Sequence, residues 1–285
     1  MTWVAWIDCT EAEAAAAELP GVTLAAHEKD DGGWRLEAYD LARPEPWVLD
    51  ALRTFAPSSP HAPQVGKIAD RDWVKYSQAA LTPVSAGRYV VHTGSYASTV
   101  RPGRIGIRIE AGRAFGTGHH ATTAGCLEAI DRAAKRGKRV RRAIDLGTGT
   151  GVLALATAKR WRRAEVVASD NDAVAVAVAR GNVRQNAVRS GRQRGMIELH
   201  VADGLRHPRL RGHYDLVVAN ILARPLRQMA PMIARAVAPS GRLVLAGLLE
   251  RQQRRVWAAY RNRGLVTARY PRHVAWPILE FTRRA

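Results

Sequence analysis

The chain has 285 residues, of which 47% are hydrophobic, enough to bury a substantial core and to exclude a globally disordered protein. Its two cysteines, Cys9 and Cys126, are too few for a disulfide framework and indicate a reducing compartment, which we expect to be the cytoplasm. The formal net charge is +19, no apolar run is long enough for a membrane span, and from the acidic first residues we expect no signal peptide.

Residues 1–60 predict a small α+β domain in which strands and helices alternate. We expect strands at 3–7, 22–26 and 34–39 and helices at 11–19 and 47–55. Thr10 precedes the first helix and Glu13 follows three residues later, which is the spacing of a capping box. A stretch rich in proline and serine then predicts a linker, so residues 61–110 are expected to hold a linker and lead-in strands at 88–92 and 104–109.

Residues 111–285 predict a larger α/β domain. After a helix that runs to residue 134, we expect strands at 140–146, 165–169, 196–201, 215–220, 241–247, 265–270 and 276–282, and helices at 152–160, 172–187, 223–237 and 250–263. Strands that alternate with helices of this length predict a mainly parallel, doubly wound sheet.

The segment 143–151, Ala-Ile-Asp-Leu-Gly-Thr-Gly-Thr-Gly, predicts a buried strand that breaks into a glycine turn and opens a helix. Gly147 and Gly149 let a ligand touch the backbone, although tight strand–helix turns also use glycine for structure alone. Asp170 closes the next apolar run, about where an acidic side chain meets a ribose in doubly wound sheets. Asp145 would repel a dinucleotide pyrophosphate, which favours S-adenosylmethionine over NAD.

Two polar residues follow later strands of the predicted sheet. Asp203 lies where an adenine amino group is often received, and it is equally suited to a turn. Asn220 ends the strand 215–220, at the edge where ligands of open α/β sheets bind. Its amide can orient an amine or hold the cofactor, and it is also placed to cap the next helix.

The loop from Phe115 to Thr123 contains two glycines that let it fold over a bound ligand. We expect Phe115 and Thr123 to contact the cofactor, and Thr122 and Thr123 are also placed to cap the following helix. His119 and His120 lie in the same loop, but no Cys, Asp or Glu stands nearby at metal-ligand spacing. We therefore predict no metal site.

These segments together resemble the PrmA family, methyltransferases of large-subunit ribosomal protein eleven. The resemblance rests on the loop FGTGHHATT, the turn AIDLGTGTGVLALA, the segment SDNDAVAVAVARGNVRQNAV and the run DLVVANILARPLRQMAPMIARAVAPSGRLVLAGLLERQ. It extends to Asp72 and Trp73, covers most of the chain and is strongest from residue 112 to 260. The loop departs from the family's common Gly-Thr-Gly-Thr-His-Pro-Thr-Thr at His119 and Ala121.

The resemblance implies a Rossmann-like class I methyltransferase sheet with a small N-terminal substrate-recognition domain. The implied reaction moves methyl groups from S-adenosylmethionine to lysine side chains of the ribosomal protein, with its α-amine as a further candidate. Cofactor contacts implied by the resemblance fall on Thr123, Gly147, Asp170 and Asn220, and the residues themselves add Gly149, Asp203 and Phe115. We expect Asn220 to orient the amine, without a dedicated base.

Three other classes of protein share parts of this pattern. An RNA or DNA adenine methyltransferase is the main alternative, but such enzymes stack the extruded base on an aromatic ring, and Ile221 and Leu222 follow Asn220 instead. A binding protein that kept the fold without catalysis would not need the intact glycine turn. A dehydrogenase is disfavoured by the missing third glycine of the dinucleotide spacing and by Asp145.

The charge is distributed unevenly along the chain. Residues 1–50 hold 3 basic and 11 acidic residues, whereas residues 119–285 hold 32 basic and 11 acidic residues. The acidic region is suited to a basic ribosomal protein, and the basic region could lie near RNA. Because 38 of the 44 basic residues are arginine and no aromatic-rich RNA motif accompanies them, the sequence favours a coding bias spread over solvated faces as the explanation of the basic region. We expect the protein to act as a monomer.

Overall fold

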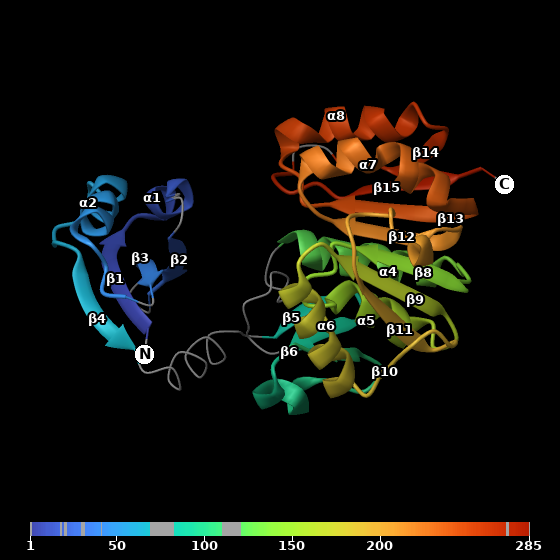
Figure 1. Cartoon of the computed structure of the whole chain (residues 1–285), viewed down its shortest axis with the longest axis horizontal. Helices are drawn as coiled ribbons and strands as arrows, with labels where there is room; N and C mark the ends of the chain where they lie inside the picture. The colour runs from blue at the N-terminus through green and yellow to red at the C-terminus, as the bar shows by residue number, and fades with distance from the viewer. Residues whose placement is uncertain are drawn as a thin grey trace. The chain divides into compact units, whose positions relative to one another are not determined.

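The computed structural model describes residues 2–17, 19, 22–29, 32–40, 42–68, 83–109, 121–271 and 274–284. The chain divides into two compact units, residues 1–79 and 80–285 (Figure 1). In the described part of the chain, no helix is long and apolar enough to span a membrane.

The first unit is a four-stranded antiparallel sheet with two helices. Its elements are β1 (Thr2–Cys9), α1 (Glu11–Ala16), β2 (Thr23–Glu28), β3 (Trp34–Asp40), α2 (Pro46–Phe55) and β4 (Gln64–Ile68). The strands lie in the order β2-β3-β1-β4. Val48 and Leu52 of α2 are buried in the same core as Ile7 and Leu36 of the sheet. The α+β arrangement agrees with the sequence pattern.

The predicted capping box at the start of α1 is confirmed. The Glu13 backbone N–H donates to Thr10 Oγ1 at 3.3 Å, and the Thr10 backbone N–H donates to Glu13 Oε2 at 2.8 Å. Ser58 also donates its hydroxyl to Glu13 at 2.6 Å, which ties the segment after α2 to the first turn of α1. These donors, the Ser58 hydroxyl first among them, lower the pKa of Glu13 to about 2.

Strand β4 falls in the segment that the sequence pattern assigned to a linker. It pairs with β1 in antiparallel register, with Ala5 opposite Val65. The sheet of the first unit therefore extends past residue 60. The sequence pattern did not reveal this strand because a short edge strand forms through pairing with its neighbour, and its own alternation of apolar and polar residues can be weak.

The second unit is built on an eight-stranded sheet in the order β10-β11-β9-β8-β12-β13-β15-β14 (Figure 1). All neighbouring strands are parallel except that β15 runs antiparallel to both β13 and β14. The strands are β8 (Arg142–Leu146), β9 (Glu165–Asp170), β10 (Arg189–Ser190), β11 (Met196–Val201), β12 (Tyr214–Asn220), β13 (Val237–Ala246), β14 (Leu265–Arg269) and β15 (Leu279–Arg283). The predicted α/β, Rossmann-like class is confirmed.

Helices cover both faces of this sheet. They are α4 (Ala121–Lys135), α5 (Val152–Arg160), α6 (Ala173–Gln185), α7 (Ala223–Ala236) and α8 (Glu250–Arg261). Buried residues of α4, α5 and α6 share one core cluster, and those of α7 and α8 share another, so the sheet has a hydrophobic layer on each side. Figure 1 shows α7 and α8 together over β13 and β15.

A small sheet precedes α4 within the second unit. Its strands are β5 (Val84–Ala86), β6 (Tyr89–His92) and β7 (Ile105–Arg108), with a 3-10 helix at Gly94–Thr99 between the last two. Tyr89 is fully buried and donates its hydroxyl to the Ala156 carbonyl of α5 at 3.3 Å. This contact attaches the small sheet to the helical layer.

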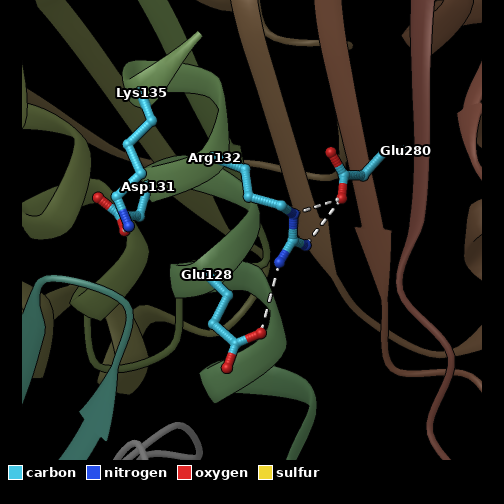
Figure 2. Close-up of polar contacts among 5 residues, drawn as sticks. All are labelled: Glu128, Asp131, Arg132, Lys135 and Glu280. Atoms are coloured by element: carbon cyan, nitrogen blue, oxygen red, sulfur yellow. Dashed lines mark hydrogen bonds and ion pairs between the residues drawn. The ribbon is translucent and has the colours of Figure 1, made fainter.

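An ion pair ties α4 to the antiparallel strand β15 (Figure 2). The carboxylate of Glu280, almost fully buried on β15, accepts hydrogen bonds from Arg132 Nε at 3.2 Å and Nη2 at 2.8 Å. Arg132 also reaches Glu128, one turn earlier on α4, at 3.4 Å. Because α4 carries Thr123 near its start, this pair helps to fix the helix that presents a predicted site residue.

Replacing Glu280 with glutamine should lower the free energy of unfolding by about 3 kcal/mol, since removing one partner leaves the other charge without compensation in a largely buried place. Glu128→Gln is the matched control, because the Glu128 side chain is half exposed, and it should cost less than about 0.5 kcal/mol. Urea unfolding followed by tryptophan fluorescence measures both. Equal small losses for the two variants would mean that the buried pair contributes no more than the exposed one.

Candidate active site

The glycine turn between β8 and α5 is held by backbone hydrogen bonds to the neighbouring strand. The N–H groups of Gly147 and Thr148 donate to the Ser169 carbonyl at 2.8 and 2.9 Å. Gly147 and Gly149 adopt φ values of +70° and +53°, and Gly151 follows at +82°. Only glycine takes this left-handed backbone at little cost, so the spacing of the glycines in the sequence follows from the shape of the turn.

Asp170 ends β9 and faces the turn. Its Oδ2 accepts the Gly149 N–H at 2.9 Å, and its Oδ1 accepts the Asp172 N–H at 3.1 Å. Each carboxylate oxygen keeps further acceptor capacity, because an ionised carboxylate offers about four lone-pair sites. The structure therefore brings together Gly149 and Asp170, which the sequence analysis placed in one site.

Asp145 lies beneath the turn, fully enclosed by the protein. Its Oδ2 accepts the Thr148 hydroxyl at 2.7 Å and the Ala154 N–H at 3.0 Å. Its Oδ1 is buried and has no hydrogen-bond partner among the described residues. Burial above all, together with the nearby negative charge of Asp170, raises the pKa of Asp145 to about 6.

A cavity of about 640 Å³ opens beside the turn, at the carboxyl ends of the parallel strands. Its walls include three predicted site residues, Gly147, Asp170 and Asp203. Ser169, Asn171, Ala202, Gly204, Arg206, Ile221, Leu222, Pro225, Gln228, Met229 and Met232 line it further, with Leu146. A cavity at this edge of an open α/β sheet is the usual place for a ligand.

The Asp203 side chain is two-thirds exposed and pairs with Arg206 at 3.0 Å. Asp203 lines the cavity and also begins a turn, since its carbonyl accepts the Arg206 N–H at 3.4 Å. The pair leaves the second carboxylate oxygen able to accept a hydrogen bond from a ligand.

Asn220 and Thr123 meet although they stand 97 residues apart in the chain. The Asn220 amide Nδ2 donates to Thr123 Oγ1 at 3.3 Å, and Thr123 is fully buried within α4. The amide is thereby oriented, and its Oδ1 is left to accept from another donor. Neither residue is among those that line the cavity just described, but Ile221 and Leu222, directly after Asn220, are.

Two capping roles considered from the sequence are wrong. The N-cap of α7 is Leu222, which makes no side-chain capping bond, so Asn220 does not cap that helix. Thr122 and Thr123 lie inside α4 rather than before it. In both cases the polar residue is used for a tertiary contact or buried packing instead of a helix end.

Several residues singled out in the sequence lie outside the described part of the chain. They are Phe115, His119, His120, Asp72 and Trp73. The predicted contact of Phe115 with the cofactor therefore stays a prediction.

Sequence reasoning missed the wall of the cavity that α7 supplies. Met229 and Met232 stand three residues apart on α7, so they share one face of the helix, and both line the cavity. The chain has only four methionines, so two at helical spacing directly after a site strand were a usable signal. Thioether side chains adapt to irregular apolar ligand surfaces.

Comparisons of this chain with known proteins point to one family. The family model described as "Ribosomal protein L11 methyltransferase (PrmA)" matches residues 34–284. A relative from Rhizobium etli (strain CIAT 652), named ribosomal protein L11 methyltransferase, is 44% identical over 254 residues, which cover 88% of this chain and 85% of the relative. A relative of the same name from Rhizobium meliloti is 40% identical over 267 residues, or 92% and 88% of the two chains.

A solved structure shares the fold. The ribosomal protein L11 methylase from Lactobacillus delbrueckii subsp. bulgaricus matches with a TM-score of 0.62 and 24% identity, over 72% of this chain and all of that one. The family model covers most of the chain, and the two relatives exceed 30% identity over most of their own length. The chain therefore belongs to the family of ribosomal protein L11 methyltransferases.

Proposed function

We propose that this protein transfers methyl groups from S-adenosylmethionine to lysine amino groups of ribosomal protein L11, with the α-amine as a further acceptor. The observation that carries the proposal is the junction of the glycine turn, Asp170 and the Asn220–Thr123 pair at one edge of the sheet, in a chain of this family. The family's protein substrate argues against the alternative of a nucleic-acid adenine as acceptor.

The residues of the cavity fit the cofactor. S-adenosylmethionine carries a ribose, an adenine, an ammonium and a sulfonium, and when bound it supplies an electrophilic methyl group. Asp170 can accept hydrogen bonds from ribose hydroxyls, and Asp203 from an adenine amino group. The orphaned Asp145 Oδ1 marks a buried negative group that a cationic ligand would stabilise. We assign Thr123, Gly147, Gly149 and Phe115 to the same cofactor site.

For methyl transfer, the protein mainly has to align the acceptor amine with the methyl group. Holding the acceptor amine in line with the methyl group supplies several kcal/mol of the barrier. A lysine amine has a reference pKa of about 10.4 and must lose its proton before it can attack, and burial beside a positive charge favours the neutral form. The Asn220 Oδ1, oriented through the Thr123 hydroxyl, can accept one N–H of that neutral amine, so no dedicated base is needed.

Cofactor affinity should depend on the proton of Asp145. Because its pKa is raised to about 6, the free protein binds a proton at pH 5 that a cationic ligand would expel. We expect the dissociation constant of S-adenosylmethionine to fall as the pH rises from 5 to 7 and then to level off. Isothermal titration in buffers of different ionisation enthalpy should detect proton release below pH 6. Asp145→Asn should bind with an affinity that no longer varies with pH; retained pH dependence in this variant would assign the effect to another group.

The acidic first unit is suited to attract the basic substrate. Glu11, Asp40, Glu45 and Asp50 are exposed on it, whereas Asp8 is already paired with Lys29 and Arg35. We expect kcat/KM for methylation of the protein substrate to fall as salt concentration rises, because exposed charges that steer association are screened. Glu45→Gln with Asp50→Asn should weaken the salt dependence. If kcat/KM of the unmodified protein did not change with salt concentration, electrostatic steering of the substrate would be excluded.

The proposal is tested directly with purified components. Protein, S-adenosylmethionine and ribosomal protein L11 are incubated together, and the substrate is weighed by intact-mass spectrometry. The mass should rise in steps of one methyl group, and peptide mapping should place the groups on amines. Because the proposed substrate is a ribosomal protein, we also propose that the enzyme acts in the cytoplasm, as a monomer.

A further inference from the structure

A second cavity, of about 420 Å³, lies between the starts of α7 and α8. Four arginines line it together with Ala223 and Gln252. Arg224 and Arg227 come from the first two turns of α7, and Arg251 and Arg255 from the first two turns of α8. Spacings of three and four residues place each pair on one face of its helix, so exposed arginines from two helices line one open space.

The four arginines have no protein partner in the described part of the chain. Elsewhere in the second unit, arginines meet carboxylates, as Arg132 meets Glu280. None of the four makes an ion pair or a side-chain hydrogen bond with a described residue. Residues 216–279 contain eleven arginines, no lysine and a single acidic residue, Glu250, which is not among the residues that line the cavity.

This arrangement costs free energy unless an anion is bound. Like charges repel one another, and a helix start already carries a partial positive charge that disfavours cations. Both helices nonetheless place two arginines within their first two turns. A general excess of arginine on solvated faces would scatter the charges and does not account for their convergence on one cavity. The feature therefore points to an anionic ligand.

The cavity is next to the methyl-transfer site. Helix α7 separates the two, since Arg224 and Arg227 line one cavity while Pro225, Gln228 and Met229 line the other. The four arginines would repel a basic protein substrate, so they do not form the binding surface for that substrate. Four guanidinium groups also exceed what a single phosphate needs, whereas a nucleic-acid strand offers a series of phosphates, one for each nucleotide.

We propose that this cavity binds successive backbone phosphates of an RNA strand. The choice of RNA rests on the proposed function, because ribosomal proteins bind RNA in the ribosome. Arginine suits this ligand, since its planar fork donates two parallel hydrogen bonds to phosphate oxygens. The contact would hold an RNA beside the site where the protein substrate is methylated.

The test is binding of a fluorescein-labelled single-stranded RNA of about 20 nucleotides, followed by anisotropy as salt is varied. The variant replaces Arg224, Arg227, Arg251 and Arg255 with glutamine. It should bind at least about tenfold more weakly, and the slope of log affinity against log salt should decrease by about 3, as expected when four phosphate contacts are lost.

The matched control replaces Arg162, Arg163, Arg180 and Arg184 with glutamine. These arginines are exposed and lie on α6 and on the turn after α5. Replacing them removes the same total charge as the first variant does. The control should lose less than about twofold in affinity. Equal weakening by both variants, or by neither, would overturn the proposal, and so would displacement of the RNA by polyglutamate as readily as by unlabelled RNA.

Two further measurements separate this proposal from the proposed function. Thermal unfolding midpoints and S-adenosylmethionine affinity should be the same in both variants as in the unmodified protein, which shows that the second unit is intact. Failure of the unmodified protein to methylate ribosomal protein L11 would overturn the proposed function, whereas the RNA-binding comparison needs no methyl transfer. If the midpoint of the first variant drops, Arg224→Gln with Arg255→Gln provides a milder pair, and its loss should be about half in log affinity.

Discussion

Replacing Asn220 with alanine is expected to lower kcat for methyl transfer by about 100-fold, because the amine loses the group that orients it. The dissociation constant of S-adenosylmethionine should change by less than about tenfold, since only one hydrogen bond at the cofactor site is lost. Single-turnover rates and cofactor titration measure the two quantities separately. A variant that binds cofactor normally and methylates at the unmodified rate would contradict the role of Asn220.

Thr123→Val provides a control for how Asn220 acts. Valine keeps the buried shape of threonine but removes the oxygen that accepts the Asn220 N–H at 3.3 Å. The variant should lose about tenfold in kcat, less than Asn220→Ala, because the amide is present but no longer held. The double variant should be no worse than Asn220→Ala alone if Thr123 acts through Asn220. Additive losses would mean that the two residues act independently.

Replacing Gly147 with alanine is expected to disrupt the turn more than the backbone angle alone requires. At φ +70°, any side chain costs about 1 kcal/mol or more. A Cβ at this position would also overlap Ile221 Cγ2, and overpacking adds about 1–3 kcal/mol. Because Gly147 lines the cavity, we expect S-adenosylmethionine to bind about 10- to 100-fold more weakly.

Gly137→Ala isolates the backbone contribution. Gly137 has nearly the same φ, +73°, but a Cβ there would meet no atom within 4 Å. It should lose only the backbone cost and leave cofactor affinity unchanged. Adding Ile221→Ala to Gly147→Ala should restore part of the lost affinity by removing the overlapping methyl group. Equal losses in the two glycine variants, by denaturant unfolding and cofactor titration, would contradict the role assigned to close packing at the turn.

The sequence predicted the α/β sheet well because its strands are buried apolar runs separated by helices of regular length. The boundaries of β9, β11 and α5 lie within a residue of the expected positions. Short elements were missed where tertiary pairing decides the structure. Strand β4 follows a proline-rich stretch and exists through its pairing with β1, and β5 has only three residues.

The residues of the candidate active site could be predicted from the sequence where the local backbone conformation allows only one type of residue. Gly147 and Gly149 occupy left-handed positions, and Asp170 receives the turn's N–H, so their spacing in the chain carries the signal. The proximity of Asn220 and Thr123 required the fold, because α4 and β12 are far apart in the sequence. The arginine cavity was not predictable either, since a net positive charge does not say which side chains converge.

Whether this chain methylates ribosomal protein L11 is tested most directly in the organism itself. Intact masses of the ribosomal proteins are compared between cells with the gene and cells in which it is deleted. We predict that ribosomal protein L11 alone becomes lighter in the deletion strain, by a whole number of methyl groups, and that Asn220→Ala on a plasmid fails to restore its mass. An unchanged mass of ribosomal protein L11 in the deletion strain would contradict the account.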